Sequence, residues 1–248
     1  MTGPGLTLAR KPLSKLALIG FLVALAGMGL FSASVFGYRS GTWFVAEVMH
    51  LAEWAVYASG VGCLLSLAGL VVSRPGGGRR GLIISLLGLV LSAPLLGMTA
   101  RFDDAAQAYP PINDISTDTE NPPVFWDMPS PIDYPGGATA ELQQAAYPDL
   151  VPLTLATSLE KTYAHALDIV KGRGWEIVAD APDEGRIEAV ASSMIFGFKD
   201  EIAIRIQEDD NGSLVDMRSR SRVGQIDRGV NAKRIRAFLK DLKRVTEG

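Results

Sequence analysis

The chain of 248 residues has little of what disulfide frameworks and metal centres require, with one cysteine and two histidines. Cys63 is that single cysteine, so no intrachain disulfide and no thiolate metal cluster can form. Asp, Glu, Lys, Arg and His are also missing from the interior of three long apolar runs. Ion pathways and proton relays through a membrane need such residues. Their absence argues against a transporter or a pump.

The three apolar runs lie in the first hundred residues, and no comparable run follows them. They cover residues 16–36, 54–72 and 81–100. Each approaches the roughly 20 residues that an α-helix needs to cross the hydrocarbon core of a bilayer. We therefore expect residues 16–101 to form a three-helix transmembrane anchor.

A cleaved signal peptide is an alternative for the first run. Its basic region would be Arg10, Lys11 and Lys15, and the small residues 32–34 would form its cleavage site. Cleavage would leave two spans and the same outward-facing domain.

The basic residues that flank the runs predict the orientation of the chain. Six of them lie on one side of the membrane: Arg10, Lys11, Lys15, Arg74, Arg79 and Arg80. Arg39 and Arg101 lie on the other side. Lys and Arg in short loops stay in the cytoplasm. We expect a multi-pass inner (plasma) membrane protein with a cytoplasmic tail, residues 1–15, and an extracytoplasmic part from residue 102 onward, which in a Gram-negative cell is periplasmic.

Two short acidic patterns raise the question of a metal site. One lies in the first loop and shares a helical face: Glu47, His50 and Glu53. The other alternates like the start of a calcium loop: Asp114, Ser116, Asp118 and Glu120. The second pattern lacks the glycine at its sixth position and has Phe125 where a bidentate glutamate belongs. We interpret the first as part of an interfacial helix and the second as turn-capping side chains, and predict no metal and no cofactor.

The extracytoplasmic part falls into two segments. Residues 102–148 are rich in proline and lack periodicity, which predicts an extended, irregular segment. Its aliphatic and aromatic residues indicate that it packs on the domain that follows. Residues 149–248 predict an α+β domain with an antiparallel sheet and both helices on its apolar face. The expected order is strand 150–156, helix 158–171, strands 175–179, 186–192, 201–207 and 214–223, and helix 231–245.

Charge is unevenly distributed over the extracytoplasmic part. Residues 102–248 contain 25 acidic and 16 basic residues, a net charge of −9, which argues against nucleic acid as a partner. Residues 103–210 hold 21 acidic and 6 basic residues, whereas residues 211–248 hold 4 acidic and 10 basic residues. The two regions are therefore expected to attract each other, unless the basic end binds an external anion.

Two motifs resemble a known family. They read NDISTDTENPPVF at residues 113–125 and RSRSRVGQIDRGVNAKRIRAFL at residues 218–239. Together they resemble the bacterial family called domain of unknown function 1499, over residues 110–242. Members often carry a few N-terminal spans, so the resemblance implies a protein of the cell envelope. It implies no activity and supplies no catalytic residues.

The basic end contains the candidate site. Arginines alternate along the last strand, and further polar residues begin the last helix. The candidate anion-binding residues are Arg218, Arg220, Arg222, Asn231 and Arg234. Guanidinium groups at this spacing suit a carboxylate or a phosphate, as in a lipid headgroup, a glycan or a peptide. The alternative is an internal salt-bridge network with Asp114, Asp118, Asp200 and Asp227.

These observations favour a binding or scaffolding role in the envelope. The expected partners are the bilayer itself and a protein, an anionic lipid or a glycan, and the oligomeric state stays open. A hydrolase that uses Ser219 or Ser221 with Asp227 and the arginines is the alternative. We assign no catalytic residues, because no histidine lies near these serines and no nucleophile elbow is present.

Overall fold

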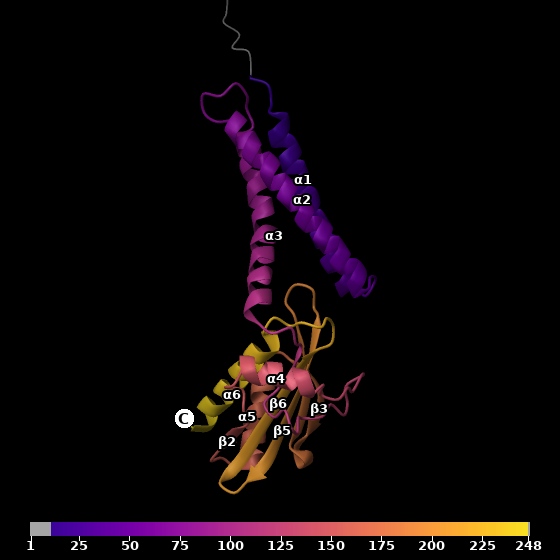
Figure 1. Cartoon of the computed structure of the whole chain (residues 1–248), viewed down its shortest axis with the longest axis vertical. Helices are drawn as coiled ribbons and strands as arrows, with labels where there is room; N and C mark the ends of the chain where they lie inside the picture. The colour runs from indigo at the N-terminus through magenta and orange to yellow at the C-terminus, as the bar shows by residue number, and fades with distance from the viewer. Residues whose placement is uncertain (1–10, 248) are drawn as a thin grey trace, which may run out of the picture. The chain divides into compact units, whose positions relative to one another are not determined.

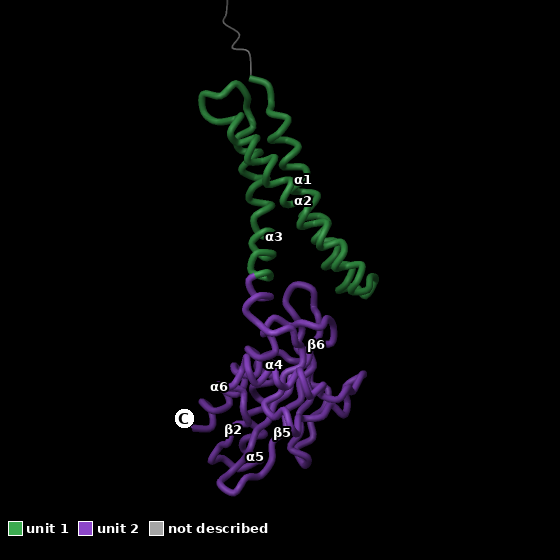
Figure 2. The backbone as a smooth tube through the Cα atoms, viewed as in Figure 1, with its two compact units in different colours: residues 1–103 green, residues 104–248 purple. Residues whose placement is uncertain are grey.

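The computed structural model describes residues 11–247 (Figure 1). The chain forms two compact units, which divide between Asp103 and Asp104 (Figure 2).

The first unit consists of three long apolar helices. They are α1 (Lys15–Arg39), α2 (Val45–Val72) and α3 (Leu82–Ala108). All three are long and apolar enough to cross a membrane. α2 begins nine residues before the apolar run that predicted it, because Glu47 stabilises its first turn. The backbone N–H of Phe44 donates to Oε2 of Glu47 at 2.6 Å.

Small residues let α1 and α2 approach closely. A Cβ atom added to Gly62 would lie 2.6 Å from the backbone N of Ala24, and one added to Gly20 would lie 2.6 Å from that of Ser66. Contacts this short leave no room for a larger side chain. The two helices therefore pack backbone to backbone, as small-residue motifs allow in apolar surroundings.

The second unit is built on one antiparallel sheet. Its strands are β1 (Asp114–Ser116), β2 (Leu153–Leu155), β3 (Glu176–Ala181), β4 (Arg186–Ser192), β5 (Lys199–Asp209) and β6 (Gly212–Ser221). The strand order is β1-β6-β5-β4-β3, and β2 pairs with the other half of the same edge of β6. The helices are α4 (Gly137–Ala146), α5 (Leu159–Gly172) and α6 (Val230–Glu247), with a short 3₁₀ turn at Pro182–Glu184. The α+β class and the element order predicted for this domain are confirmed.

One face of the sheet packs against α5 and α6. Alternate residues of β5 point to this face and are fully buried, as in Ile202, Ile204 and Ile206. Phe238 and Leu242 of α6 and Val170 of α5 belong to the same core. The prediction that both helices cover the apolar face is confirmed.

The other face is covered by residues 117–134, which we call the strap. Phe125 and Met128 of the strap form a second, smaller core with Val190 and Ala203 of the sheet. The strap is irregular, but its flanks contain β1 and α4 where the sequence indicated neither. β1 is too short to show periodicity. α4 depends on a tertiary contact that no local pattern contains, in which the buried side chain of Gln143 bonds to both the N–H and the carbonyl of Ser116.

Candidate functional site

The alternation of β6 places its charged residues on the strap face. Asp216, Arg218 and Arg220 share this face, whereas Met217 and Ser219 point toward α6. Arg222 follows directly after the strand and donates on the strap side, to Glu201 of β5. The strap therefore decides what these arginines can reach.

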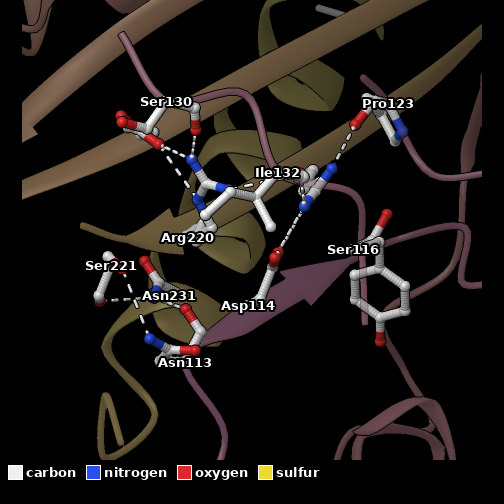
Figure 3. Close-up of polar contacts among 12 residues, drawn as sticks. Asn113, Asp114, Ser116, Pro123, Ser130, Ile132, Arg220, Ser221 and Asn231 are labelled. Atoms are coloured by element: carbon white, nitrogen blue, oxygen red, sulfur yellow. Dashed lines mark hydrogen bonds and ion pairs between the residues drawn. The ribbon is translucent and has the colours of Figure 1, made fainter. Parts of the chain in front are cut away.

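Arg218 is the most completely enclosed of these arginines, with 1% of its surface exposed. Its Nε and Nη2 atoms donate to the two carboxylate oxygens of Asp114 at 2.9 and 2.8 Å. Its remaining donors reach backbone carbonyls of the strap, at Pro123 and Ile132 (Figure 3). Every terminal nitrogen of this guanidinium thus has a protein partner.

Arg220 is held in the same way by a carboxylate and the strap. Its guanidinium pairs with the fully buried carboxylate of Glu201 and donates from Nη2 to the carbonyl of Ser130 at 2.8 Å (Figure 3). The ring of Phe125 lies under both arginines, 4.6 Å from Cζ of Arg218 and 4.8 Å from Cζ of Arg220. An external anion would have to displace these carboxylates to reach either guanidinium.

Arg222 is the accessible member of the row, with 36% of its side chain exposed. Its Nε donates to Oε1 of Glu201 at 3.0 Å. Glu201 therefore bridges Arg220 and Arg222 and carries the negative charge between them.

Asn231 and Arg234 lie on the opposite face of the sheet. The side chain of Asn231 accepts from the hydroxyl of Ser219 at 2.8 Å and donates to the carbonyl of Asn113 at 2.9 Å. Arg234 pairs with Asp200 and donates to the hydroxyl of Ser219 at 2.9 Å. The structure thus divides the five candidate anion-binding residues between two faces and does not bring them into one site.

Asp227 caps the start of α6. Its carboxylate oxygens accept the backbone N–H groups of Gly229 at 2.9 Å and Asn231 at 2.7 Å. Burial raises the pKa of this carboxyl, the nearby charge of Asp200 adds to the rise, and the two backbone hydrogen bonds and Arg234 oppose it. The basic first turn of α6, which is unfavourable for the helix dipole, is balanced by Asp227 and Asp200.

The four acidic residues expected in an internal network have different roles. Asp114 pairs with Arg218, Asp200 with Arg234, and Asp118 lies 3.6 Å from Nη2 of Arg205. Asp227 accepts backbone N–H groups. Two residues of the segment Asp114–Glu120 that resembled a calcium loop have partners within the protein. Asp114 is buried and binds Arg218, and Asp118 accepts the N–H groups of Glu120 and Asn121 in a local turn.

Three carboxylates on the strap face are buried, and sequence reasoning assigned none of them to the network: Glu188, Glu201 and Asp216. Glu188 accepts the backbone N–H of Trp126 at 2.7 Å and pairs with Arg186 at 2.9 Å. Asp216 pairs with Arg205 at 2.8 Å. Their positions in the two-residue alternation of the strands, on the same face as the arginines, were the signal that could have found them.

The buried arginines and carboxylates of the strap face form a layer, which we call the buried charge layer. A groove of about 300 Å³ opens beside it. Its lining comes from the strap, the 3₁₀ turn and the strands: Pro123, Val124, Trp126, Glu184, Arg186, Ala203, Ile204 and Arg205. Trp126 is 69% exposed at its rim, although its backbone is held by Glu188. The groove thus combines an exposed indole with two guanidinium groups and a carboxylate.

The model of the family described as Protein of unknown function (DUF1499) matches residues 114–242. The chain belongs to this family. No curated protein and no solved structure matches the chain. The matched region begins at β1 and ends within α6, so the DUF1499 domain contains the strap, the sheet and the buried charge layer.

The serines of the alternative hydrolase are engaged inside the DUF1499 domain. Ser219 is fully buried and bonded to Asn231 and Arg234. The hydroxyl of Ser221 accepts from the side chain of Asn231 at 3.0 Å. The carboxylate of Asp227 is bonded to backbone N–H groups, so this geometry offers neither serine a general base.

Within residues 11–247, no group of three or more His, Cys, Asp and Glu side chains is arranged to hold a metal ion. His50 lies 3.7 Å from Glu53, and Glu47 caps α2. The residues of the first loop therefore belong to the start of a long helix rather than to a separate interfacial one.

Proposed function

We propose that this protein is a binding or scaffolding protein of the cell envelope, anchored in the inner membrane by α1–α3. Its DUF1499 domain lies on the periplasmic side and presents the Trp126 groove to a partner protein. The observation that carries the proposal is a large aromatic side chain that is exposed while its backbone is held rigidly.

Several features of the groove support a protein partner. Trp and Arg are the residue types that contribute most often to the energetic centre of protein interfaces. Trp126 stands beside Arg186 and Arg205, which carboxylates hold in fixed positions. Preorganised side chains lose little conformational entropy on binding. A depression of about 300 Å³ is of the size that accommodates one or two side chains of a partner.

The buried charge layer supports binding over catalysis. Arg218 and Arg220 use their donors to hold the strap, and the strap carries Trp126. The layer thus shapes a recognition surface instead of exposing reactive groups.

The proposal is tested by photo-crosslinking of the full-length protein in its native membranes. A photoreactive phenylalanine analogue replaces Val124, which lines the groove beside Trp126, in one variant and Val151, which is exposed outside the groove, in the control. We expect discrete protein adducts from position 124 and none of the same mass from position 151. Identical adduct patterns, or none at position 124, would refute a partner protein at the groove.

A further inference from the structure

Two loops of the DUF1499 domain lie at the same end of the sheet. One is the β4–β5 hairpin loop, residues 193–198, and the other is the β6–α6 loop, residues 222–229. Asp200 pairs with Ser221 in the sheet, and the N–H of Arg222 donates to the carbonyl of Lys199 at 3.0 Å. Figure 1 shows the two loops side by side, the first in orange and the second in yellow.

The chain enters the domain at this same end. The N–H of Ser221 donates to the carbonyl of Asn113 at 3.0 Å, and that of Asp227 donates to the carbonyl of Ile112 at 3.1 Å. Tyr109 packs so closely on the β6–α6 loop that a Cβ atom at Gly229 would lie 2.7 Å from its ring. The start of the domain is therefore fixed to this end of the sheet.

Chain connectivity keeps this end near the bilayer. Eight residues lie between Ala100, the last residue of the third apolar run, and Tyr109. Those up to Ala108 are helical, and a helix rises about 1.5 Å per residue, so the separation is at most roughly 14 Å along the helix. The polar layer on each side of the hydrocarbon core is itself about 5–7 Å thick.

The surface of this end is apolar at its tips. Met194 is 92% exposed, and Ile195, Ile226 and Val230 are exposed large aliphatic residues. The rings of Phe196 and Phe198 stack with centroids 5.0 Å apart, which gives the hairpin loop a rigid base. Gly197 takes a left-handed conformation, with φ of 77°, that closes the loop.

Basic residues surround these tips, and charged residues of both signs are mostly engaged. Four basic residues lie in or beside the two loops: Lys199, Arg222, Arg228 and Lys233. Arg222 pairs with Glu201, whereas Lys233 is exposed, with Nζ 4.6 Å from the centroid of the Tyr109 ring. Asp200 pairs with Arg234, Asp227 caps α6, and Glu201 is fully buried between arginines. Glu176 pairs with Lys199 at 3.2 Å, and Asp103 and Asp104 are exposed on α3.

We propose that this end of the domain is a membrane-docking face. The tip of the β4–β5 loop, Met194 and Ile195, enters the headgroup region of the bilayer that holds the anchor. The surrounding lysines and arginines contact anionic headgroups. Apolar side chains flanked by basic ones are the composition that binds the surface of an anionic bilayer.

Docking would fix the orientation of the domain on the membrane. The Trp126 groove is lined by Glu184 and Arg186, which lie at the far end of β4 from the hairpin loop. The docked domain would thus hold the groove away from the lipid surface. This inference rests on the membrane anchor of the proposed function, but it uses other residues of the domain than the Trp126 groove.

The test uses the full chain in nanodiscs, with Cys63→Ser as background because Cys63 is the single cysteine. Met194→Cys carries a polarity-sensitive fluorophore, and Asn211→Cys, in the exposed turn at the opposite end of the sheet, is the matched control. The nanodiscs contain phosphatidylglycerol and lipids that carry a nitroxide in the headgroup region. We expect several-fold stronger quenching at position 194 than at position 211.

Equal quenching at the two positions would overturn the proposal. A fluorophore at position 194 that is shielded from water to the same degree in lipid-free amphipol would also overturn it, since protein and not lipid would then cover the loop. A second pair of variants tests the basic residues. In anionic nanodiscs, Lys233→Glu should reduce quenching at position 194, whereas Lys240→Glu, farther along α6, should not; equal effects would contradict a role for headgroup charge.

Discussion

At the scale of single residues, Arg218 shows how this domain handles buried charge. Desolvation of a guanidinium and a carboxylate is costly, and a bidentate pair with further hydrogen bonds offsets that cost. Asp114 supplies the pair, and the carbonyls of Pro123 and Ile132 supply the rest. The arginine therefore joins β1, β6 and the strap.

Arg218→Ala should lower the free energy of unfolding by about 3–5 kcal/mol, because Asp114 would remain buried without its partner. Arg244→Ala is the control, since Arg244 is 74% exposed and its pair with Asp241 is worth about 0–1 kcal/mol. Denaturant unfolding of the purified full-length protein, followed by tryptophan fluorescence, measures both. Similar losses in the two variants would show that the buried pair does not stabilise the domain.

At the scale of elements, the start of α6 depends on Asp227. Two backbone N–H groups of the first turn lose their acceptor if this carboxylate is removed. The same carboxylate is buried, and its pKa is raised. Its charged form is therefore less favourable in the folded protein than in the unfolded chain.

The raised pKa gives a pH dependence with a defined sign. The stabilisation due to this group is fully present below its unfolded pKa, near 3.8, and is lost as the pH rises through the folded pKa. Asp227→Asn removes the charge and keeps one acceptor. The substitution should therefore cost less stability at pH 7 than at pH 4, measured by denaturant unfolding of both proteins at each pH. A larger cost at pH 7 would contradict the raised pKa.

The elements also show which predictions the sequence could support. The alternation in β5 and β6 and the turn Asp210-Asn211-Gly212 predicted that these two strands form a hairpin, because both are local signals. The arginines of the strap face were foreseen only as two alternatives, an external anion site or an internal salt-bridge network. β1, α4 and the carboxylates of Glu188 and Glu201 were missed, since their roles come from contacts between residues distant in the chain.

At the scale of the whole molecule, three long apolar helices precede the DUF1499 domain. The basic residues at 74, 79 and 80 between α2 and α3 predict that this loop is cytoplasmic and that the domain lies across the membrane from it. Single cysteines introduced into the Cys63→Ser variant show on which side of the membrane each position lies.

Gly78→Cys should resist a membrane-impermeant maleimide in cells with an intact inner membrane. Asn211→Cys should react once the outer membrane is made permeable. Lysis of the inner membrane should make both react, which is the internal control. The reverse pattern of labelling would invert the proposed orientation.

The sequence by itself determined the three apolar helices, the α+β class and the alternation that lines up the arginines on one strand face. These properties follow from the order of neighbouring residues, since helix and strand periods are local. Only the tertiary structure decided that Arg218 and Arg220 are enclosed while Arg222 stays accessible, and that Asn231 and Arg234 lie across the sheet from them. Burial depends on the strap, whose Ile132 meets Arg218 although 86 positions separate them in the chain. No local pattern contains that contact, because it is made by packing.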